Sequence, residues 1–366
     1  MRIVFAGGGT GGHLYPGLAI ARALVRLDPS ARPFFVGARR GIERDVLPGT
    51  EFPHALLDLH PLYRSRPWEN WKTLRGLVGA WRAIGALVRE ERPRVVVGTG
   101  GYASGAMLAY AAVRGIPYVQ QTADAFPGLT ARLFARRARE IYLGFPEAKP
   151  HFPAGPRTEF VDTGNPIEPP PRPRPDRAAA RAKWGLPPVG GTVLLVFGGS
   201  QGAQAINRAV AEWVRGGVGE GLYVIWGTGK NNYEEFRDLE GPGVRVLPYL
   251  SPISDAYAAS DLALVRAGAI TSAELAAWEI PALFVPLPTA AQDHQTKNAE
   301  ALAAAGAAVH LRQSELTAAS LAAAVRALAG DRARLSAMRE RLAARARPDA
   351  AQRIAERILA LAKRGA

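Results

Sequence analysis

Cysteine is absent from the chain, and this absence removes three kinds of chemistry at once. None of the 366 residues carries a thiol, so disulfides, thiolate nucleophiles and cysteine-ligated zinc sites are excluded. Long apolar runs are missing too, because arginine or glycine interrupts each one before the roughly 18 residues that a membrane-spanning helix needs. The apolar segment after Arg2 is too short for the apolar region of a signal peptide. We therefore expect a cytoplasmic protein that is at most peripheral to a membrane.

Acidic residues are scarce relative to basic ones. The chain has 46 Lys and Arg against 32 Asp and Glu, a formal net charge of +14, and the larger part of this excess lies in residues 1–165. Such a charge suits either a solvated, arginine-rich surface or contact with nucleic acid or an anionic bilayer. The sequence shows no helix-turn-helix, RNA-recognition or zinc-finger motif, so nucleic acid is the less favoured partner.

The length and the order of elements indicate two domains of the α/β class. A chain of 366 residues is too long for one ordinary core. Apolar strand-like segments alternate with helical ones, which is typical of βαβ units around a parallel sheet. The alternation stops at the proline-dense stretch 165–178, which we interpret as a semi-rigid linker, and then restarts. We expect two doubly wound domains at 1–165 and 166–349, with a ligand cleft between them at the carboxyl ends of the strands, and a further amphipathic helix at 350–366.

The expected strands are MRIVFAG, RPFFVGA, RVVVGTG, PYVQQT, EIYLGF and TEFVDTG in the first domain, and TVLLVFGG, GLYVIWGTG, GVRVLPYL, DLALVRAG and PALFVPLP in the second.

Three glycine-rich turns each join a short apolar strand to a helix. They are GGGTGGH at residues 7–13, GTGGYAS at 98–104 and GGSQGAQ at 198–204. Glycine lets the backbone adopt positive φ, so successive N–H groups can converge on an anion. The helix that follows adds unpaired donors and the positive end of its dipole. The repetition predicts a protein that handles one or more phosphorylated ligands.

The first turn also fits a different cofactor. Gly7, Gly9 and Gly12 satisfy the G-x-G-x-x-G pattern of dinucleotide-binding proteins, and Arg39 and Arg40 after the next strand could hold a 2′-phosphate. An NADP-dependent dehydrogenase is therefore an alternative. The second and third turns count against it, because a single dinucleotide site does not need them.

The second domain places polar side chains after consecutive strands. Glu274 follows RAGAITSA, and we expect it on the first turn of the next helix, where a carboxylate can accept two sugar hydroxyls or simply satisfy the helix dipole. After the next strand come Asp293, His294, Gln295 and Asn298, whose amides and short acid suit the hydroxyl edge of a hexose. Taken singly, each is more often a capping or surface residue.

Taken in order along the chain, seven motifs resemble the MurG family of glycosyltransferases. They are GGGTGGHLYPGLAIA, GTGGYASG, FPGLT, TGNPI, FGGSQGAQAIN, RAGAITSAELAAWEIPALFVPLP and DHQTKNAEAL. The resemblance implies a GT-B fold with two Rossmann-like domains and no obligatory metal or cofactor. It also implies inverting transfer of N-acetylglucosamine from UDP-N-acetylglucosamine to the undecaprenyl-diphospho-muramoyl-pentapeptide lipid, the step from lipid I to lipid II of peptidoglycan synthesis. Such an enzyme serves cell-wall biogenesis, cell shape and division from the cytoplasmic face of the inner membrane, to which it is peripherally attached.

By position, the resemblance assigns the donor mainly to the second domain. Ser200, Gln201 and their loop would bind the diphosphate, and Leu250 would meet uracil through its backbone. Glu274 would hold the ribose. The nucleoside would also be surrounded by Ala269, Ile270 and Thr271. The N-acetylglucosamine hydroxyls would be held by Gln295 with His294 beside it, and would be reached from the first domain by Thr10, Gly11 and Gly12.

The chain departs from the family pattern in two places. The family usually reads HEQN before PGLT, whereas residues 121–124 read QTAD, so Asp124 stands where an asparagine is usual. After TGNP the family usually has Val-Arg, whereas this chain has Ile167 and Glu168. Glu168 cannot supply a cation, so we assign no binding role to that position.

Inverting transfer needs a base that accepts the proton of the attacking sugar hydroxyl, and it needs stabilisation of the departing diphosphate. The third glycine-rich turn can stabilise the diphosphate through N–H groups and a helix N-terminus. His13, which closes the first turn, is our first candidate for the base, although it would alternatively cap the helix. Asp124 is the second candidate and is particular to this chain.

A lipid acceptor also requires a membrane-facing surface. Residues 68–90 predict a helix that is amphipathic, bears tryptophan and is basic, which is typical of an interfacial helix on anionic lipid. An ordinary helix that packs on the core is the equal alternative. The apolar positions are Trp71, Leu74, Val78, Trp81 and Leu87, and the basic ones are Arg64, Arg66, Lys72, Arg75, Arg82 and Arg89.

Three classes of function therefore remain open from the sequence. A glycosyltransferase would bind UDP and no nicotinamide, and a dehydrogenase would do the reverse. A non-catalytic sugar-nucleotide sensor would bind the donor without turnover. Within the first class, a related GT-B transferase acting on diacylglycerol or another lipid is the closest rival.

Overall fold

The chain forms two compact units in the computed structural model, which describes residues 1–59, 70–153, 155, 157–199 and 202–364. The first unit comprises Met1–Glu168 and Arg347–Ala366, and the second comprises Pro169–Ala346. The chain thus passes between the units once inside the proline-dense stretch and once just before the last helix.

The first unit is built on a parallel sheet, here sheet A, with strand order β3-β2-β1-β4-β5-β6-β7 in the described residues. Valine, isoleucine and phenylalanine dominate the central strands and are fully buried, as in parallel sheets whose two faces are both covered by helices. The strands are β1 (Arg2–Gly7), β2 (Arg32–Ala38), β3 (His54–Leu57), β4 (Val95–Gly100), β5 (Tyr118–Thr122), β6 (Glu140–Leu143) and β7 (Glu159–Asp162).

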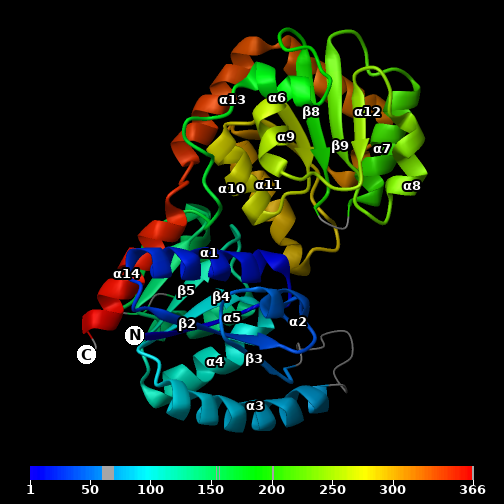
Figure 1. Cartoon of the computed structure of the whole chain (residues 1–366). Helices are drawn as coiled ribbons and strands as arrows, with labels where there is room; N and C mark the ends of the chain where they lie inside the picture. The colour runs from blue at the N-terminus through cyan, green and yellow to red at the C-terminus, as the bar shows by residue number, and fades with distance from the viewer. Residues whose placement is uncertain (60–69, 154, 156, 200–201, 365–366) are drawn as a thin grey trace. The chain divides into compact units, whose positions relative to one another are not determined.

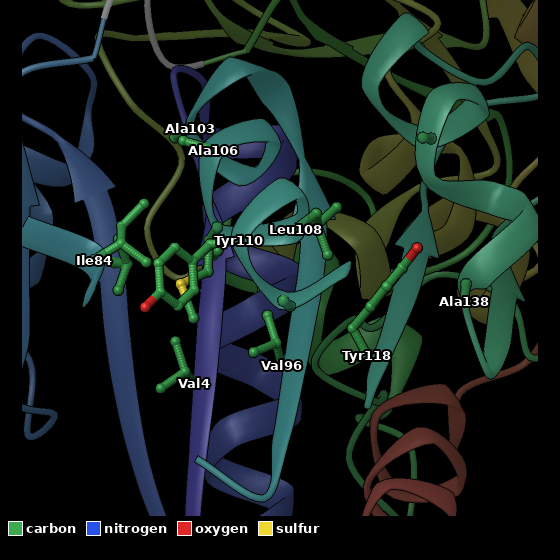
Figure 2. Close-up of a cluster of buried hydrophobic side chains, with 14 of the residues drawn as sticks. Val4, Ile84, Val96, Ala103, Ala106, Leu108, Tyr110, Tyr118 and Ala138 are labelled. Atoms are coloured by element: carbon green, nitrogen blue, oxygen red, sulfur yellow. The ribbon is translucent and has the colours of Figure 1, made fainter. Parts of the chain in front are cut away.

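Helices cover both faces of sheet A (Figure 1). The apolar stripes of α1 (Gly11–Leu27) and α14 (Ala350–Arg364) pack on one face, against side chains such as Phe5 and Val97. On the other face lie α3 (Asn70–Glu91), α4 (Gly101–Arg114) and α5 (Leu129–Phe134). Figure 2 shows Ile84 of α3 and Tyr110 of α4 in one cluster with Val4 and Val96 of the sheet. The short helix α2 (Glu43–Val46) follows β2.

The last helix, α14, belongs to the first unit although it follows the second in the chain. Ile354 and Ile358 are fully buried in the cluster that α14 shares with α1. Arg357 donates to Glu140 and Glu159 at 2.6 Å each. These two acids begin β6 and β7, so the guanidinium ties the helix to the amino ends of both strands.

The second unit repeats the same architecture around sheet B, with strand order β10-β9-β8-β11-β12-β13 in the described residues. Its strands are β8 (Thr192–Phe197), β9 (Leu222–Gly227), β10 (Val244–Leu247), β11 (Leu262–Val265), β12 (Ala282–Phe284) and β13 (Ala308–His310). Its helices are α6 (Arg177–Lys183), α7 (Gln204–Arg215), α8 (Tyr233–Phe236), α9 (Ile253–Ala259), α10 (Ala269–Trp278), α11 (His294–Ala304), α12 (Ala318–Gly330) and α13 (Arg332–Arg345).

In both sheets the strand order reverses beside the first strand, and ligands of doubly wound folds bind at this point of reversal. In sheet A it lies between β1 and β4, which lead into the first and second glycine-rich turns. In sheet B it lies between β8 and β11, which lead into the third turn and the RAG segment 266–268. The α/β class and the doubly wound sheets expected from the sequence are confirmed.

Two strands were not expected, and both are edge strands. β3 and β13 have four and three residues, and each pairs with a neighbour on one side only. Their sequences, HALL and AVH, show no apolar alternation, and the neighbouring strand provides the pairing. Each of the eleven expected strands contains one observed strand.

Candidate functional site

The first two glycine-rich turns interlock at the carboxyl edge of sheet A. Gly8, Gly9, Gly100 and Gly101 all have positive φ, between 75° and 153°. The Gly8 N–H donates to the Gly100 carbonyl at 3.3 Å. A Cβ on Gly101 would collide with the Gly8 carbonyl. Glycine is therefore required at these positions by both the backbone angle and the close approach of the two turns.

A buried carboxylate lies beneath the first turn. Glu43 is completely inaccessible to solvent. Its Oε2 accepts from the Gly9 N–H at 2.8 Å and its Oε1 from the Ala38 N–H at 3.0 Å. A side chain at Gly8 or Gly41 would collide with the carboxyl group. Glu43 thus holds the first turn to the end of β2, through a contact that spans 34 residues of sequence.

These bonds change the expected role of the first turn. The N–H groups of Gly8 and Gly9 donate to the Gly100 carbonyl and to the Glu43 carboxylate. The expectation that successive N–H groups of this turn converge on an anion is therefore wrong for these two. The first N–H group that bonds back within α1 is that of His13. The candidate anion donors of this turn are therefore the N–H groups of the helix start, at Gly11 and Gly12.

His13 lies between the two turns. It is the third residue of α1 and is half-buried. Its Nδ1 lies 3.1 Å from the Oγ1 of Thr10, which is exposed. Its ring fills the space that a Cβ on Gly100 would occupy. The imidazole is thus held by both turns at the switch point of the sheet.

Asp124 lies in the segment after β5, which neighbours β4 in sheet A, and is half-buried. The adjacent Ala123 carbonyl accepts from the Asn165 Nδ2 at 2.9 Å, and the Asn165 Oδ1 accepts from the Gln121 side chain at 2.9 Å. Asn165 is buried, and a Cβ on Gly144 would collide with it. The asparagine of the TGNP motif therefore fixes the backbone that carries Asp124. Because β1, β4 and β5 are consecutive in the sheet, His13 and Asp124 share one edge.

Glu168, where the family usually has a cation, lies near a basic residue of its own unit. The pKa of Arg22 is raised, first by its hydrogen bond to Glu51 and further by the negative charges of Glu51 and Glu168. The acid at this position therefore stabilises a nearby guanidinium.

The third glycine-rich turn lies at the switch point of sheet B. Ser200 and Gln201 lie outside the described residues, so the structure does not place them. On either side, Gly199 and Gly202 have φ of 87° and 78°, and the Gly202 N–H donates to the Gly199 carbonyl at 3.0 Å. The helix α7 begins two residues later.

A single carbonyl, at the end of β9, binds side chains that flank this turn and packs against the turn itself. The Thr228 carbonyl accepts from the Asn207 Nδ2 at 2.8 Å and from the Asn232 Nδ2 at 3.2 Å. A Cβ on Gly202 would collide with the same carbonyl. The Asn207 Oδ1 in turn accepts from the Trp226 indole N–H at 3.0 Å. All three hydrogen bonds join residues of the second unit.

The expected nucleoside residues lie at the carboxyl ends of neighbouring strands of sheet B. Leu250 is buried and packs over Gly227, at the end of β9. Ala269 is the first residue of α10, and the first N–H to bond back within that helix is that of Ser272. The two residues between them, Ile270 and Thr271, are half-buried. The start of α10 therefore faces the same edge as the third turn.

Glu274 is on the second turn of α10, not on the first as expected, because the helix begins at Ala269. Its Oε2 accepts from the Tyr257 hydroxyl at 2.9 Å. Burial, and then the charge of Glu274, raise the pKa of Tyr257 well above its usual value. Tyr257 therefore stays a neutral donor that orients the carboxylate.

The residues after β12 form a strained turn into α11. Gln292 and Asp293 have φ of 57° and 55°, which is uncommon for residues other than glycine and is often found at functional sites. The Gln295 Oε1 accepts from the Leu287 N–H at 2.9 Å. The end of the amide that does not face Leu287 is therefore the NH₂ group, which is a donor. The His294 Nδ1 lies 2.7 Å from the Ala291 carbonyl, which assigns the proton to Nδ1 and leaves Nε2 as an acceptor.

Asn298 is fully buried, and its Nδ2 donates to the Ala267 carbonyl at 3.1 Å. The expectation that it meets a hexose is wrong, because this bond ties α11 to the RAG segment. Arg266 of that segment donates to the carbonyls of Val285 and Pro286 at 3.0 Å each. Its partial burial lowers the pKa of the guanidinium.

Sequence reasoning assigned no role to four residues that hold these turns. Each bonds to backbone groups of another segment, and three of them lie in the motifs TGNPI, FGGSQGAQAIN and RAGAITSAELAAWEIPALFVPLP. A buried polar side chain needs hydrogen-bond partners. A polar residue among the apolar residues and glycines of a motif was therefore the available sign that it holds another segment. The four residues are Glu43, Asn165, Asn207 and Arg266.

The predicted interfacial helix corresponds to α3. Leu87 is buried in the core, and with Ala80 and Ile84 it forms the face that packs on α4, so the interpretation as an ordinary core helix is correct for this part. Trp81 is 37% exposed and its ring lies 4.9 Å from that of Tyr110. Arg82 and Arg89 are exposed. The side chains of residues 60–78, including the other apolar and basic positions named above, lie outside the described set.

Two features are absent from the described part of the chain. It contains no group of three or more His, Asp or Glu side chains arranged to hold a metal ion. None of its helices combines the length and the hydropathy that crossing a membrane requires.

Comparison with known families matches most of the chain. Residues 3–143 match the glycosyltransferase family 28 N-terminal domain, and residues 193–354 match the glycosyltransferase family 28 C-terminal domain. The first match lies in the first unit. The second covers most of the second unit and extends into the start of α14, which belongs to the first unit. Together they include all three glycine-rich turns.

Similar proteins carry one recurrent name. A protein of Salinibacter ruber, named UDP-N-acetylglucosamine–N-acetylmuramyl-(pentapeptide) pyrophosphoryl-undecaprenol N-acetylglucosamine transferase, is 42% identical, and the alignment covers 99% of this chain and 97% of that protein. A protein of the same name from Desulforudis audaxviator is 40% identical over the full length of both. Among solved structures, that of Acinetobacter baumannii MurG has a TM-score of 0.76 at 29% identity, covering 98% of this chain and 99% of that one. A UDP complex of Staphylococcus aureus MnaA has a TM-score of 0.68 at 15% identity, covering 99% and 98%, which supports the fold alone.

Proposed function

The chain belongs to glycosyltransferase family 28, and we propose that it transfers N-acetylglucosamine from UDP-N-acetylglucosamine to undecaprenyl-diphospho-N-acetylmuramoyl-pentapeptide. This reaction converts lipid I to lipid II in peptidoglycan biosynthesis. The observation that carries the proposal is the identity of about 40%, over nearly the full length, to proteins named for this transfer. A dehydrogenase is not favoured, since both units match glycosyltransferase domains.

The donor is assigned to the second unit. Its diphosphate would lie at the third turn, against Ser200, Gln201 and the start of α7, where N–H groups and the helix dipole favour negative charge. Leu250 and the start of α10 would surround the nucleoside, at Ala269, Ile270 and Thr271. The carboxylate of Glu274, oriented by Tyr257, suits the two ribose hydroxyls.

The sugar of the donor is assigned to the start of α11. The bond from the Leu287 N–H occupies the carbonyl end of Gln295, so its NH₂ group would donate to a hydroxyl oxygen. His294, protonated on Nδ1, would accept through Nε2. From the first unit, Thr10 and the N–H groups of Gly11 and Gly12 would reach the reacting sugar or the acceptor diphosphate.

Transfer requires in-line attack of an acceptor hydroxyl on the anomeric carbon, loss of the hydroxyl proton and departure of UDP. We assign the proton to His13, which two rigid turns hold at the switch point. Asp124 shares the same edge and is the second candidate. The third turn and the start of α7 would stabilise the departing diphosphate, and inversion follows from a single displacement.

A membrane-anchored acceptor implies that the first unit works against a lipid surface. Trp81 of α3, Val113 of α4 and Leu133 of α5 are exposed apolar side chains on helices that cover the same face of sheet A. Arg82 and Arg114 are exposed beside them in sequence. Apolar side chains flanked by arginines suit an anionic leaflet, so we place the enzyme peripherally on the cytoplasmic face of the inner membrane.

One experiment tests the activity and the acceptor together. Radiolabelled UDP-N-acetylglucosamine is offered with lipid I, with diacylglycerol or with no acceptor, and the lipid products are separated. We expect label in the lipid I product alone. Transfer to diacylglycerol would indicate the rival transferase, and donor binding without any transfer would indicate a sugar-nucleotide sensor.

A further inference from the structure

A cavity lies in the second unit, at the amino ends of the strands of sheet B. Its volume is about 790 Å³, within the roughly 300–1,000 Å³ that is typical of small-molecule sites. Thr192 and Leu222, the first residues of β8 and β9, line it, so it opens at the edge opposite to the third turn and the start of α10. Five arginines contribute to its lining, namely Arg177, Arg181, Arg326, Arg332 and Arg339.

The acids of the lining do not balance these arginines. They are Glu220 and Asp261. The Asp261 carboxylate accepts from Arg177 and from Arg181 at 2.5 Å each, and from the Val193 N–H at 2.9 Å. One carboxylate is therefore already saturated by two guanidinium groups and a backbone donor.

Arg339 is paired more loosely than these two arginines, and it also donates to the Asp261 backbone carbonyl at 3.5 Å. Its guanidinium lies 3.6 Å from the same Asp261 carboxylate, and 35% of the side chain is exposed. Burial first, and then repulsion by Arg177, lower the pKa of Arg339, while the negative charges of Asp261 and Glu279 act in the opposite direction. A partly buried cation is costly unless it is closely paired, and the Asp261 carboxylate lies 3.6 Å away and is shared with two other arginines, so an added anion would stabilise this guanidinium further.

The opposite wall adds two further cations. Arg326 lies on α12 and Arg332 begins α13, and both are exposed. Within the described residues, neither guanidinium makes an ion pair or a hydrogen bond with another protein group. Glycines with positive φ, among them Gly190 and Gly219, form part of the lining, and their lack of side chains leaves the cavity open.

We propose that this cavity binds a small anion that carries two or more phosphate groups. Guanidinium groups pair bidentately with phosphate oxygens, and here they come from α6, α12 and α13. Because the cations stand on separate elements around a large cavity, a chain of phosphates matches them better than one phosphate or one carboxylate. The site is separate from the donor site of the proposed function and does not depend on it.

The test is calorimetric titration of the full chain with sodium tripolyphosphate, in the presence of UDP at a concentration that saturates the donor site. We expect one saturable binding event in the parent protein. The double variant Arg326→Ala/Arg332→Ala should weaken it about tenfold or more, since charge-assisted bonds are lost. Arg334→Ala is the matched control, because Arg334 is exposed on the same helix but does not line the cavity, and it should bind as the parent does.

Two outcomes would overturn the proposal. One is the absence of saturable tripolyphosphate binding to the parent protein. The other is equal weakening by the control and by the double variant, which would indicate diffuse surface charge. Titration with UDP alone is read separately, so a failure of the donor site is distinguishable from a failure of this cavity.

Discussion

The two candidate bases can be separated by single substitutions. Asp124→Asn keeps the size of the side chain and restores the amide that is usual in the family, but removes the basic oxygen. If His13 takes the proton, turnover of Asp124→Asn at saturating substrates stays within about twofold, whereas His13→Gln loses about 10²–10⁴-fold, the usual contribution of a general base. Single-turnover transfer of radiolabelled sugar measures both. The reverse order of effects would assign the proton to Asp124.

Glu43 lends itself to an equally conservative substitution. In Glu43→Gln one carboxylate oxygen becomes an NH₂ group that faces the N–H of Gly9 or of Ala38. An unsatisfied buried donor costs about 1–3 kcal/mol, and the first turn must shift to relieve it. We expect kcat/KM for the lipid acceptor to fall about tenfold or more while UDP binds as before, because UDP is assigned to the other unit. Glu51→Gln is the control, since Glu51 is 53% exposed and pairs with Arg22.

A loss of UDP affinity equal to the loss of acceptor activity in Glu43→Gln would contradict this assignment. It would show that the substitution disturbs the whole chain and not the first turn. Hydrogen exchange of the amides of residues 7–13, compared between parent and variant, gives an independent measure of how firmly the turn is held.

Among the elements, α14 makes the clearest prediction about stability. Ile358 is fully buried between α14 and α1. Ile358→Ala should lower the free energy of local opening of these two helices by about 2–5 kcal/mol, through lost burial and a new cavity. Hydrogen exchange of α1 and α14 measures it. Ala360→Ser, on the exposed side of α14, should change it by less than about 0.5 kcal/mol, and an equal effect of both variants would contradict the docking described here.

The strands and turns differ in how far sequence predicts them. The central strands were predictable because their valine, isoleucine and leucine runs end in glycine. The edge strands β3 and β13 were not, because HALL and AVH show no apolar alternation and no glycine follows them, whereas the equally short edge strand β7 runs into Gly164. The position of the candidate site was also predictable, since every glycine-rich turn follows a strand. The partner of the Gly9 N–H was not, because Glu43 reaches it only once β2 and α2 have folded back onto the sheet.

For the whole molecule, the net charge of +14 predicts salt-dependent attachment to anionic vesicles. Flotation should fall steeply as salt rises, because the Debye length shortens from about 10 Å at 0.1 M to about 3 Å at 1 M. Trp81→Glu and Val113→Glu should each reduce flotation at low salt, because a carboxylate is repelled by the leaflet and the apolar contact is lost.

The control for vesicle attachment is Leu27→Glu. Leu27 is 41% exposed, but it ends α1, which covers the other face of sheet A. Leu27→Glu changes the net charge by the same amount as the other two variants. It should therefore float as the parent does, except for the loss that this change of charge causes by itself. If all three variants lose flotation equally, attachment depends on total charge and the apolar side chains take no part.

The return of the chain to its first unit has a consequence for biosynthesis. Sheet A and α1 leave the ribosome early, but α14, which covers the apolar side of α1, is translated only after the whole second unit. Until then the nascent first unit exposes the buried positions of α1, a surface that chaperones bind and that aggregates readily. The second unit, by contrast, is continuous in sequence and can fold as it emerges. A message that stops before α14 should therefore yield a protein that still binds the nucleotide but is degraded by proteases through its incomplete first unit.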